Sequence, residues 1–228
     1  MQTRTKALIF ALVAATPMLA VAGGGTVVKL DGVASVERRS GKVPAKEATP
    51  LYSGDTLRVM DQGVAQLRFE DDSVFVVPGA ATFRVDRFVM PFGGSGGTAL
   101  YTLVEGSVRT ITGSIKGEYA LRTDEATITV KGSAYKALLC KGACAKKYKG
   151  GLYVQAESGE ITVTSGTGGM TLKRGMTGLA ERHESAVVRV KVSPFDDPQF
   201  AAGFGVSTEF EVEVHPPRIE PEKPASKS

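Results

Sequence analysis

The sequence predicts an all-β protein, in which short antiparallel strands stack in a rolled, solenoid-like or sandwich-like arrangement with little helix. Three observations support this class. Many short stretches alternate apolar or β-branched residues with polar ones, as half-buried strands do. The 228 residues include 27 glycines and no tryptophan, which suits many tight turns. Apart from a single turn expected near residues 197–202, apolar residues do not recur at helical spacing.

The strands are expected to follow one another at short intervals, each ended by a turn signal. Residues 64–69 alternate, with Ala65, Leu67 and Phe69 on one face. An acidic turn at 70–73 leads back into the next strand, so the two predict a hairpin. A loop rich in glycine and proline is expected between the first two strands. The predicted strands are 26–36, 55–59, 64–69, 74–77, 82–89, 99–104, 107–111, 119–123, 126–130, 135–140, 152–157, 160–164, 170–173, 177–181 and 186–192.

A loose internal repeat supports a stacked architecture. A glycine turn followed by a strand recurs at 31–36, 105–108 and 158–163, and the first and third copies continue alike into a second glycine turn. The spacing between the copies is uneven, so the chain is not a uniform solenoid. The alternative is chance recurrence of glycine turns in an all-β chain.

The first 22 residues predict an export signal. Two cations precede an apolar run at 7–19, which an A-x-A cleavage site at 20–22 follows. The run is too short for a spanning helix, so we expect no stable membrane span. We expect cleavage after Ala22 and a mature chain in the periplasm; an uncleaved anchor is the alternative.

The charge balance argues against nucleic-acid binding. The chain has 28 basic and 24 acidic residues. Removing Arg4 and Lys6 with the leader leaves 26 against 24, a net charge of +2. Nucleic-acid binders carry a much larger basic excess on one face.

The two cysteines of the chain are Cys140 and Cys144, in the sequence CKGAC. In an oxidising compartment such a pair predicts a disulfide that closes a tight loop. A redox or metal role is the alternative, but C-x₃-C is not the usual redox spacing and a metal would need further ligands. We therefore expect a structural disulfide, no metal and no cofactor.

Catalytic chemistry has little support in the sequence. After the leader there are two histidines, His183 in a charged turn and His215 in the terminal segment, and neither accompanies a nucleophile elbow. The paired acids Asp71-Asp72, and a second pair at 196–197, lie in turns, where carboxylates usually cap backbone amides. We expect a non-enzymatic protein. The alternative is an envelope enzyme that uses the turn acids on a polysaccharide.

A lysine-rich stretch is the sharpest signal for binding. From 131 to 149 there are six lysines and no acid, with two tyrosines interleaved. A surface of this kind predicts an acidic partner, either an envelope protein or an anionic envelope polymer. The alternative is a solvated loop whose lysines discourage edge-strand pairing. The candidate binding residues are Lys131, Tyr135, Lys136, Lys141, Lys146, Lys147, Tyr148 and Lys149.

Three segments, taken in order, resemble the FecR-type periplasmic domain family. That family has a Gly-Asp turn, here Gly54-Asp55, then a hairpin of the pattern G-x-A-x-L-x-F-x-D-x-S, then a segment A-T-x-x-V-(Arg or Lys)-G-(Thr or Ser). The resemblance spans about residues 25–182 and implies a β domain. Its segments are GVAQLRFEDDSVFVVPGAATFRV at 63–85, ALYTLVEGSVRTITG at 99–113 and RTDEATITVKGSAY at 122–135.

The last of these segments contains a predicted strand at 126–130. Its even-numbered apolar residues should face one side and its odd-numbered polar residues the other. Gly132-Ser133 is then expected at a close approach, where a side chain would block a neighbouring strand. This segment is expected to maintain the fold.

The best-known members of the family imply a sensing role. In them the domain is the periplasmic half of an inner-membrane regulator, which senses an outer-membrane ferric-siderophore transporter and signals to a cytoplasmic sigma factor. We expect this chain to lack the cytoplasmic segment and spanning helix of that mechanism. The resemblance therefore implies only an exported, non-catalytic module that binds or senses a protein or an envelope polymer. We expect a leader at 1–22, this domain at 23–182, an additional β hairpin or strap at 183–214 and a disordered tail at 215–228.

Overall fold

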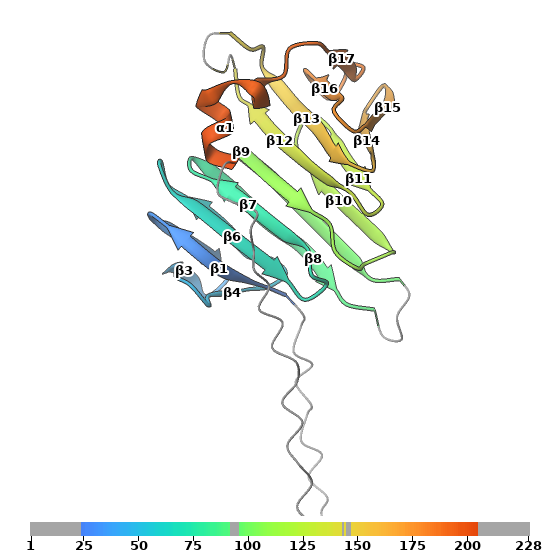
Figure 1. Ribbon diagram of the computed structural model, residues 1–228. Coiled ribbons are helices and arrows are strands. Elements are labelled where there is room, and N and C mark those ends of the chain that lie inside the picture. Colours follow the sequence, from blue (N-terminus) through green and yellow to red (C-terminus); the bar gives the residue numbers. More distant parts are fainter. Residues whose placement is uncertain (1–23, 92–95, 143, 145–146, 205–228) are drawn as a thin grey trace, which may run out of the picture.

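The computed structural model describes residues 24–91, 96–142, 144 and 147–204 (Figure 1). The leader expected at 1–22 and the tail expected at 215–228 lie outside these residues. The described chain is mostly β, with 58% in strands and 6% in helices, and its strands belong to one large mixed sheet that does not close. The predicted all-β class with little helix is confirmed.

The described elements are seventeen strands followed by two short helical segments. No helix in this part of the chain is long and apolar enough to cross a membrane. The 3₁₀ helix η1 spans Pro194–Asp196, and the α-helix α1 spans Pro198–Phe204. The strands are β1 (Gly25–Asp31), β2 (Ala34–Arg38), β3 (Gly41–Pro44), β4 (Pro50–Leu51), β5 (Thr56–Val59), β6 (Val64–Phe69), β7 (Val74–Pro78), β8 (Ala81–Val89), β9 (Thr98–Ile111), β10 (Glu118–Arg122), β11 (Thr127–Val130), β12 (Ala134–Cys140), β13 (Gly151–Ser158), β14 (Glu160–Ser165), β15 (Gly168–Lys173), β16 (Thr177–Ala180) and β17 (Val188–Val190).

The strand pairings divide the sheet into two layers that share β9. Layer A has the order β4–β1–β6–β7–β9–β12–β13–β16–β17. Layer B has the order β3–β2–β5–β8–β9–β10–β11–β14–β15. Residues 98–105 of β9 pair in layer B, and residues 106–111 pair in layer A. Among the described strands, β9 and β10 form the one parallel pair.

Gly106 lets β9 pass from one layer to the other. Its φ of +86° lies in the left-handed region, which glycine adopts without strain. A Cβ at this position would lie 2.6 Å from the carbonyl oxygen of Ala80, so a side chain would also clash. Two strands were predicted here, at 99–104 and 107–111; the structure has one strand that bends, as strands that switch layers do.

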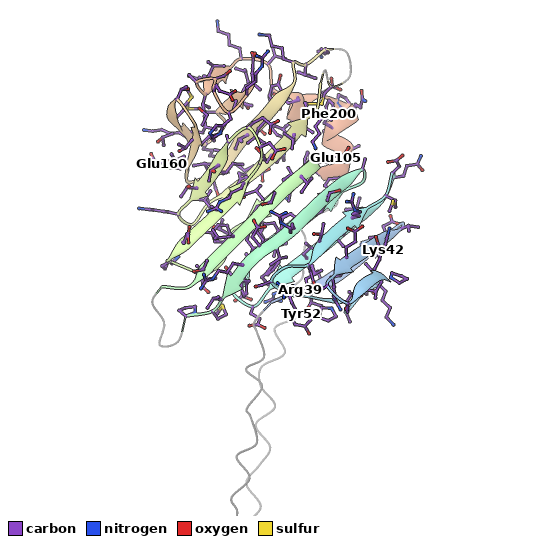
Figure 2. The ribbon with its side chains drawn as sticks, turned by 180° about the vertical axis from the view of Figure 1, so that it is seen from behind. Arg39, Lys42, Tyr52, Glu105, Glu160 and Phe200 are labelled. Atoms are coloured by element: carbon purple, nitrogen blue, oxygen red, sulfur yellow. A yellow bond between two sulfur atoms is a disulfide. The ribbon has the colours of Figure 1, made fainter. Side chains whose placement is uncertain are left out.

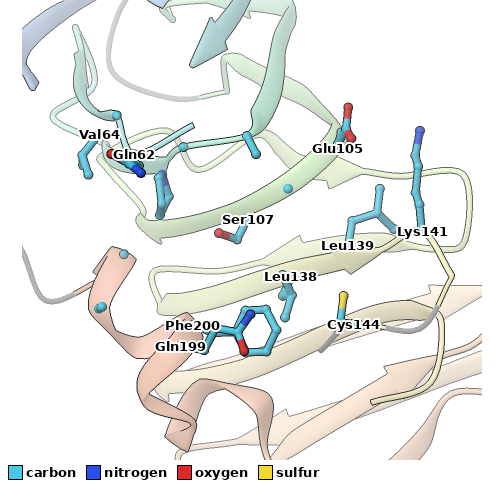
Figure 3. Close-up of a pocket in the computed structure, with 17 residues that line it drawn as sticks. Gln62, Val64, Glu105, Ser107, Leu138, Leu139, Lys141, Cys144, Gln199 and Phe200 are labelled. Atoms are coloured by element: carbon cyan, nitrogen blue, oxygen red, sulfur yellow. The ribbon is translucent and has the colours of Figure 1, made fainter. Parts of the chain in front are cut away.

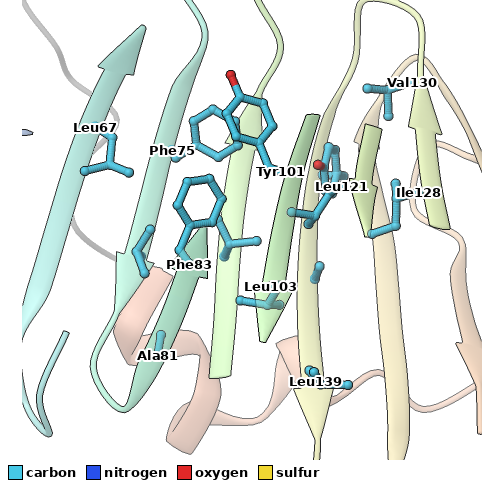
Figure 4. Packing of buried hydrophobic residues seen from close by; sticks show 14 of the residues in the cluster. Leu67, Phe75, Ala81, Phe83, Tyr101, Leu103, Leu121, Ile128, Val130 and Leu139 are labelled. Atoms are coloured by element: carbon cyan, nitrogen blue, oxygen red, sulfur yellow. The ribbon is translucent and has the colours of Figure 1, made fainter. Parts of the chain in front are cut away.

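The apolar faces of the two layers enclose one hydrophobic core, which we call the inner core (Figure 4). Phe75 comes from layer A, and its ring centroid lies 5.1 Å from that of Phe83 and 4.7 Å from that of Tyr101, both in layer B. Phe69 of layer A lies 5.1 Å from Phe88 of layer B in the same way. Because inward positions alternate along each strand, the same alternation that predicts the strands also predicts this core.

Two other stretches of the predicted strand order differ from the structure. Residues 26–36 form two strands, β1 and β2, because the chain turns at Gly32 with a φ of +81°. The loop expected after them contains two further short strands, β3 and β4. All four residues of β3 are exposed, so this edge strand has no alternation from which it could be recognised.

The strand predicted at 126–130 is β11, and its alternation is confirmed. Ala126, Ile128 and Val130 are buried in the inner core. The close approach expected at Gly132 is wrong, because a Cβ there would meet no described atom within 4 Å. Glycine is suited to this position by its φ of +68° instead. The close approach lies at Gly159, where a Cβ would lie 2.3 Å from the Oγ of Ser133.

Residues 193–204 lie across the outer face of layer A, where part of the additional hairpin or strap was expected (Figure 1). The Oγ of Ser193 accepts a hydrogen bond from the N–H of Phe195 at 3.2 Å and caps η1. Phe195 and Phe204 then pack on outward side chains of β12, β13 and β16. These contacts form a second hydrophobic cluster, the outer cluster, of Leu138, Cys140, Tyr148, Tyr153, Leu179, Phe195 and Phe204, with Cys144, Val190 and Phe200 packed against it.

Candidate functional site

The structure does not gather the predicted lysine-rich residues on one surface. Lys131 and Lys141 are exposed beyond opposite ends of β12, and a seven-residue strand separates its ends by about 20 Å. Tyr135 is fully buried in the inner core, and Tyr148 is buried in the outer cluster. Lys146 lies outside the described residues. The remaining lysines fall into two separate settings.

Lys136 stands on the outer face of layer A inside an ion cluster. Its Nζ lies 3.1 Å from the Oε1 of Glu157, and the Nε of Arg109 donates to the Oε2 of Glu157 at 2.6 Å. The same ammonium lies over the ring of Phe204, and its Nζ is 5.8 Å from the ring centroid. Lys136 is therefore half-buried and shares the single carboxylate of Glu157 with Arg109, and it holds the end of α1 against the sheet.

The predicted disulfide between Cys140 and Cys144 is confirmed, with the two Cα atoms 5.5 Å apart. It closes the start of the connection between β12 and β13, which lies at one end of layer A. The N–H of Tyr148 donates to the carbonyl oxygen of Cys144 at 3.0 Å, so a backbone hydrogen bond also holds the part of the connection that follows the disulfide. The exposed lysines around this disulfide loop are Lys141, Lys147 and Lys149.

Two of these three lysines have acidic neighbours. The Nζ of Lys147 lies 3.4 Å from the Oδ2 of Asp197, and the Nζ of Lys149 lies 2.8 Å from the Oε1 of Glu181. The hydrogen bond to Glu181 raises the pKa of Lys149. A hydrogen bond from the backbone N–H of Gln199, rather than Lys147, is the main cause that lowers the pKa of Asp197. Lys141 makes no ion pair with a described residue, so its charge is the least compensated of the three.

Beside the disulfide loop lies a groove of about 500 Å³ between α1 and the strand ends of layer A (Figure 3). Its lining is mostly apolar side chains and backbone, with two ionisable side chains, Glu105 and Lys141. Figure 3 shows both of them at one end of the groove. The lining comes from Gln62–Val64, Pro78–Ala80, Glu105–Ser107, Leu138, Leu139, Lys141, Cys144, Gln199, Phe200, Ala202 and Gly203.

The turn acids do not form an exposed catalytic pair. Asp71 has no exposed surface, and its Oδ1 accepts hydrogen bonds from the N–H and the Oγ of Ser73 at 3.1 and 2.6 Å. Asp72 binds Arg68 at the surface, at 2.6 Å. A carboxylate without solvent contact cannot reach a glycan, so Asp71 and Asp72 cannot act on one as a pair.

The other candidates for catalysis are the acids at 196–197 and the two histidines. Asp196 is exposed, while Asp197 accepts a hydrogen bond from the N–H of Gln199 and pairs with Lys147. His183 is exposed in the turn that follows β16, and His215 lies outside the described residues. In the described ranges, no three side chains of His, Cys, Asp or Glu are grouped so that they could hold a metal ion.

A polar cluster inside the inner core had not been foreseen. The hydroxyl groups of Tyr101, Tyr119 and Tyr135, the Oδ2 of Asp71 and the Oγ1 of Thr110 are buried without a hydrogen-bond partner among the described residues. Burial raises the pKa of all three phenols above its usual range, and the charge of Asp71 adds to this for Tyr101. Tyr101 and Tyr135 both occupy the inward positions of strands whose sequence alternates between apolar and polar residues. This pattern could have placed them in the core.

Comparison with known proteins leaves the family open. No family model matches the chain, and no curated protein matches it. Solved structures that are similar include two crystal structures, at 2.50 and 1.65 Å resolution, of a candidate anti-sigma factor from Parabacteroides distasonis ATCC 8503. Each is 15% identical, has a TM-score of 0.47 and covers 61% of this chain and 61% of that chain. A likeness at this distance assigns neither a family nor a partner.

Proposed function

We propose that this chain is a non-catalytic binding module of the cell envelope, which holds a segment of a partner protein in the groove beside the disulfide loop. The observation that carries this proposal is the groove of about 500 Å³, because binding sites of proteins are typically concave, largely apolar and supplied with few polar groups. The A-x-A leader pattern and the disulfide support an exported, oxidising location.

The groove suits an extended segment in which an apolar residue lies next to an acidic one. Val64, Leu138 and Phe200 supply apolar contact surface along the groove. Lys141, which makes no ion pair with a described residue, offers its ammonium to a partner carboxylate, while Glu105 at the same end disfavours a second acid nearby. We therefore still propose an acidic partner, but one that is bound by a single principal lysine and not by a broad basic surface.

The chemistry of the lining favours binding over turnover. Its described residues include one acid and one base, Glu105 and Lys141, and no histidine, while Cys144 is held in the disulfide. Nucleophilic or general acid–base catalysis needs a reactive group with a second group that activates it and holds it in place. The lining offers no such pair.

The test is affinity capture from envelope extracts with the protein purified after export. Lys141→Glu reverses the charge at the groove, and Ala202→Trp, on exposed helix surface, fills it. Lys131→Glu is the matched control, because it reverses an exposed lysine beyond the opposite end of β12. We expect both groove variants to lower recovery of a specific captured protein at least tenfold, and the control to leave it unchanged.

Two results would overturn this proposal. One is equal recovery of the captured protein by the wild type, Lys141→Glu and Ala202→Trp. The other is binding of the protein to a protease-treated extract that still contains its anionic polysaccharide. The ligand would then be a polymer and not a protein.

A further inference from the structure

A second concave surface lies on the outer face of layer A, at the edge that β17 forms. It has a volume of about 410 Å³, and we call it the β17 groove. Gln155 of β13, Thr177 of β16 and Val190 of β17 line it as one cross-strand row, and Val190 packs against the outer cluster. Ser193 lines it from the connection between β17 and η1. The β17 groove shares no lining residue with the groove beside the disulfide loop, so the two are separate sites.

Three polar side chains of this lining, Gln155, Thr177 and Ser193, lie against one another, and we call them the polar trio. The Nε2 of Gln155 lies 3.4 Å from the Oγ1 of Thr177 and 3.3 Å from the Oγ of Ser193. Thr177 is 3% exposed and Ser193 is 6% exposed, so both hydroxyl groups belong to the floor of the groove. The Oγ of Ser193 also accepts a hydrogen bond from the N–H of Phe195 at 3.2 Å, which holds this side chain in place.

The polar trio carries more hydrogens than its members can share. With Gln155 oriented as above, its amide donates to the two hydroxyl groups, and the hydrogens of both hydroxyls have no acceptor among the described residues. If the amide is turned over, the hydroxyls donate to its oxygen, and its own two N–H hydrogens are left instead. In either orientation, two hydrogen-bond donors remain for an acceptor that lies in the groove.

The charges around the groove favour the same kind of ligand. Arg189 and Lys191 line it, and neither of them forms an ion pair with a described acid. Asp196, which is exposed, is the one acid among the described lining residues. A negatively charged group with several acceptor oxygens therefore matches both the surplus donors and the two cations.

We propose that the β17 groove binds a phosphate group. The surplus donors of the polar trio hold its oxygens, and Arg189 and Lys191 neutralise its charge. A phosphate group carries about −1.5 to −2 charges at pH 7 and three acceptor oxygens that face different directions, whereas a carboxylate has a single charge and two oxygens in one plane. Donors on the floor and cations from β17 and its end therefore suit phosphate better. This inference goes beyond the proposed function, because it concerns another ligand in another groove.

Titration of the isotope-labelled protein, purified after export and followed by NMR at constant ionic strength, tests this site. The probes are inorganic phosphate, glycerol 3-phosphate and acetate. We expect both phosphates to shift the amide signals of residues 175–177 and 189–196 saturably, and acetate to bind at least tenfold more weakly. Tighter binding of glycerol 3-phosphate would identify a phosphate ester as the preferred group, and equal binding would identify free phosphate.

Three variants separate the contributions of donors and charge. Gln155→Glu keeps the shape of the side chain and still accepts from both hydroxyls, but it leaves no surplus hydrogen and adds a negative charge, so phosphate affinity should fall at least tenfold. Lys191→Glu, at an exposed position, should have an effect of the same size. Asp196→Asn should instead raise the affinity about threefold, because it removes a like charge.

The matched control is Lys42→Glu, which makes the same change of charge on the exposed strand β3 and should leave the affinity unchanged. Three results would overturn the inference. The first is the absence of saturable shifts at the β17 groove with either phosphate. The second is acetate binding as tight as phosphate binding, because the groove would then attract any negative charge. The third is equal weakening by Lys191→Glu and Lys42→Glu, because the net charge of the molecule would then govern binding.

Discussion

The inner core and the outer cluster share the strands of layer A, but the sequence builds them differently. The inner core takes alternate residues from nearly every strand, and both layers supply its aromatic rings. The outer cluster takes the opposite residues of three strands and completes them with a loop and a short helix. Its strand members are Leu138, Cys140, Tyr153 and Leu179, and its cover is Tyr148, Phe195 and Phe204.

The difference between the two outer faces of the sandwich shows when a cover is needed. On layer B the outward positions of β11 and β14 are threonines, such as Thr129 and Thr162, which are exposed and can stay in water. Figure 2 shows Lys42 and Glu160 toward the two sides of the same layer, on exposed positions. On layer A the outward positions of β12, β13 and β16 include the large apolar residues Leu138, Tyr153 and Leu179, and a solvated apolar face costs free energy. Outward apolar residues in a strand therefore predict that another piece of chain packs on them.

Alkaline pH should have the largest effect, and it acts on the inner core. The pKa values of Tyr101, Tyr119 and Tyr135 in the folded state lie above the value of about 10 in an unfolded chain. The unfolded chain therefore releases these protons first. The contribution of the three tyrosines to the free energy of unfolding is fully present below pH 10, and it is lost as pH rises toward the folded-state pKa values. The expected loss in free energy of unfolding is up to about 1.4 kcal/mol per pH unit for each tyrosine, and up to about 4 kcal/mol per pH unit for the three together.

Urea unfolding at pH 9, 10 and 11 measures this loss. Tyr119→Phe removes one titrating group and should lower the slope by about one third. Tyr52→Phe, at an exposed tyrosine, should leave the slope unchanged. Identical slopes in all three proteins would mean that the buried phenols do not govern the alkaline transition.

The second largest effect should come from the outer cluster. Phe195→Ala removes a ring that is 3% exposed and packs edge-to-face on Phe204, with centroids 5.8 Å apart. Deleting a buried aromatic ring typically costs about 3 kcal/mol or more in free energy of unfolding. Val192→Ala, at an exposed valine nearby in the chain, should change it by less than about 0.5 kcal/mol.

The shape of that unfolding curve sharpens the comparison. Leu138 and Tyr153 of the outer cluster lie on the same strands as Tyr135 and Val154 of the inner core. The two regions should therefore unfold together, and Phe195→Ala should shift a single transition. A new early transition with an unchanged main one would show that the outer cluster unfolds by itself.

Much of the fold could be predicted from alternation, and the exceptions have clear reasons. Strands with one buried face, such as β6, β11 and β14, were located nearly to the residue. β3 was not predicted because all four of its residues are exposed and show no alternation. β9 was predicted as two strands because the glycine in its middle indicates a turn. α1 was expected only as a turn, since its seven residues are too few to show helical periodicity and packing holds it in place.

The candidate site was harder to predict because it depends on distant contacts. The alternation of Tyr135 with Ala137 and Leu139 already indicates that this tyrosine faces inward, and a strand between Lys131 and Lys141 already separates the two lysines. The groove could not be inferred in this way. Its lining comes from five separate parts of the chain, and no local pattern records how they meet.

The smallest of the three effects should come from the disulfide, which belongs to the outer cluster. The bond between Cys140 and Cys144 closes a loop of five residues, and loop-closure entropy for so short a loop is worth about 2 kcal/mol. Changing both cysteines to serine should lower the free energy of unfolding by about that amount, measured in urea at pH 7. Tyr148 lies just past this loop and packs against Tyr153 and Phe200, so the loss should loosen the outer cluster first.

Hydrogen exchange of the doubly substituted protein locates this loss. Amides in residues 147–153 and 193–204 should exchange faster than in the wild type, whereas those of β6, β7 and β8, which enclose the inner core, should change only by the shift in global stability. Uniformly faster exchange throughout the sheet would contradict this, because it would mean that the loop supports both regions equally.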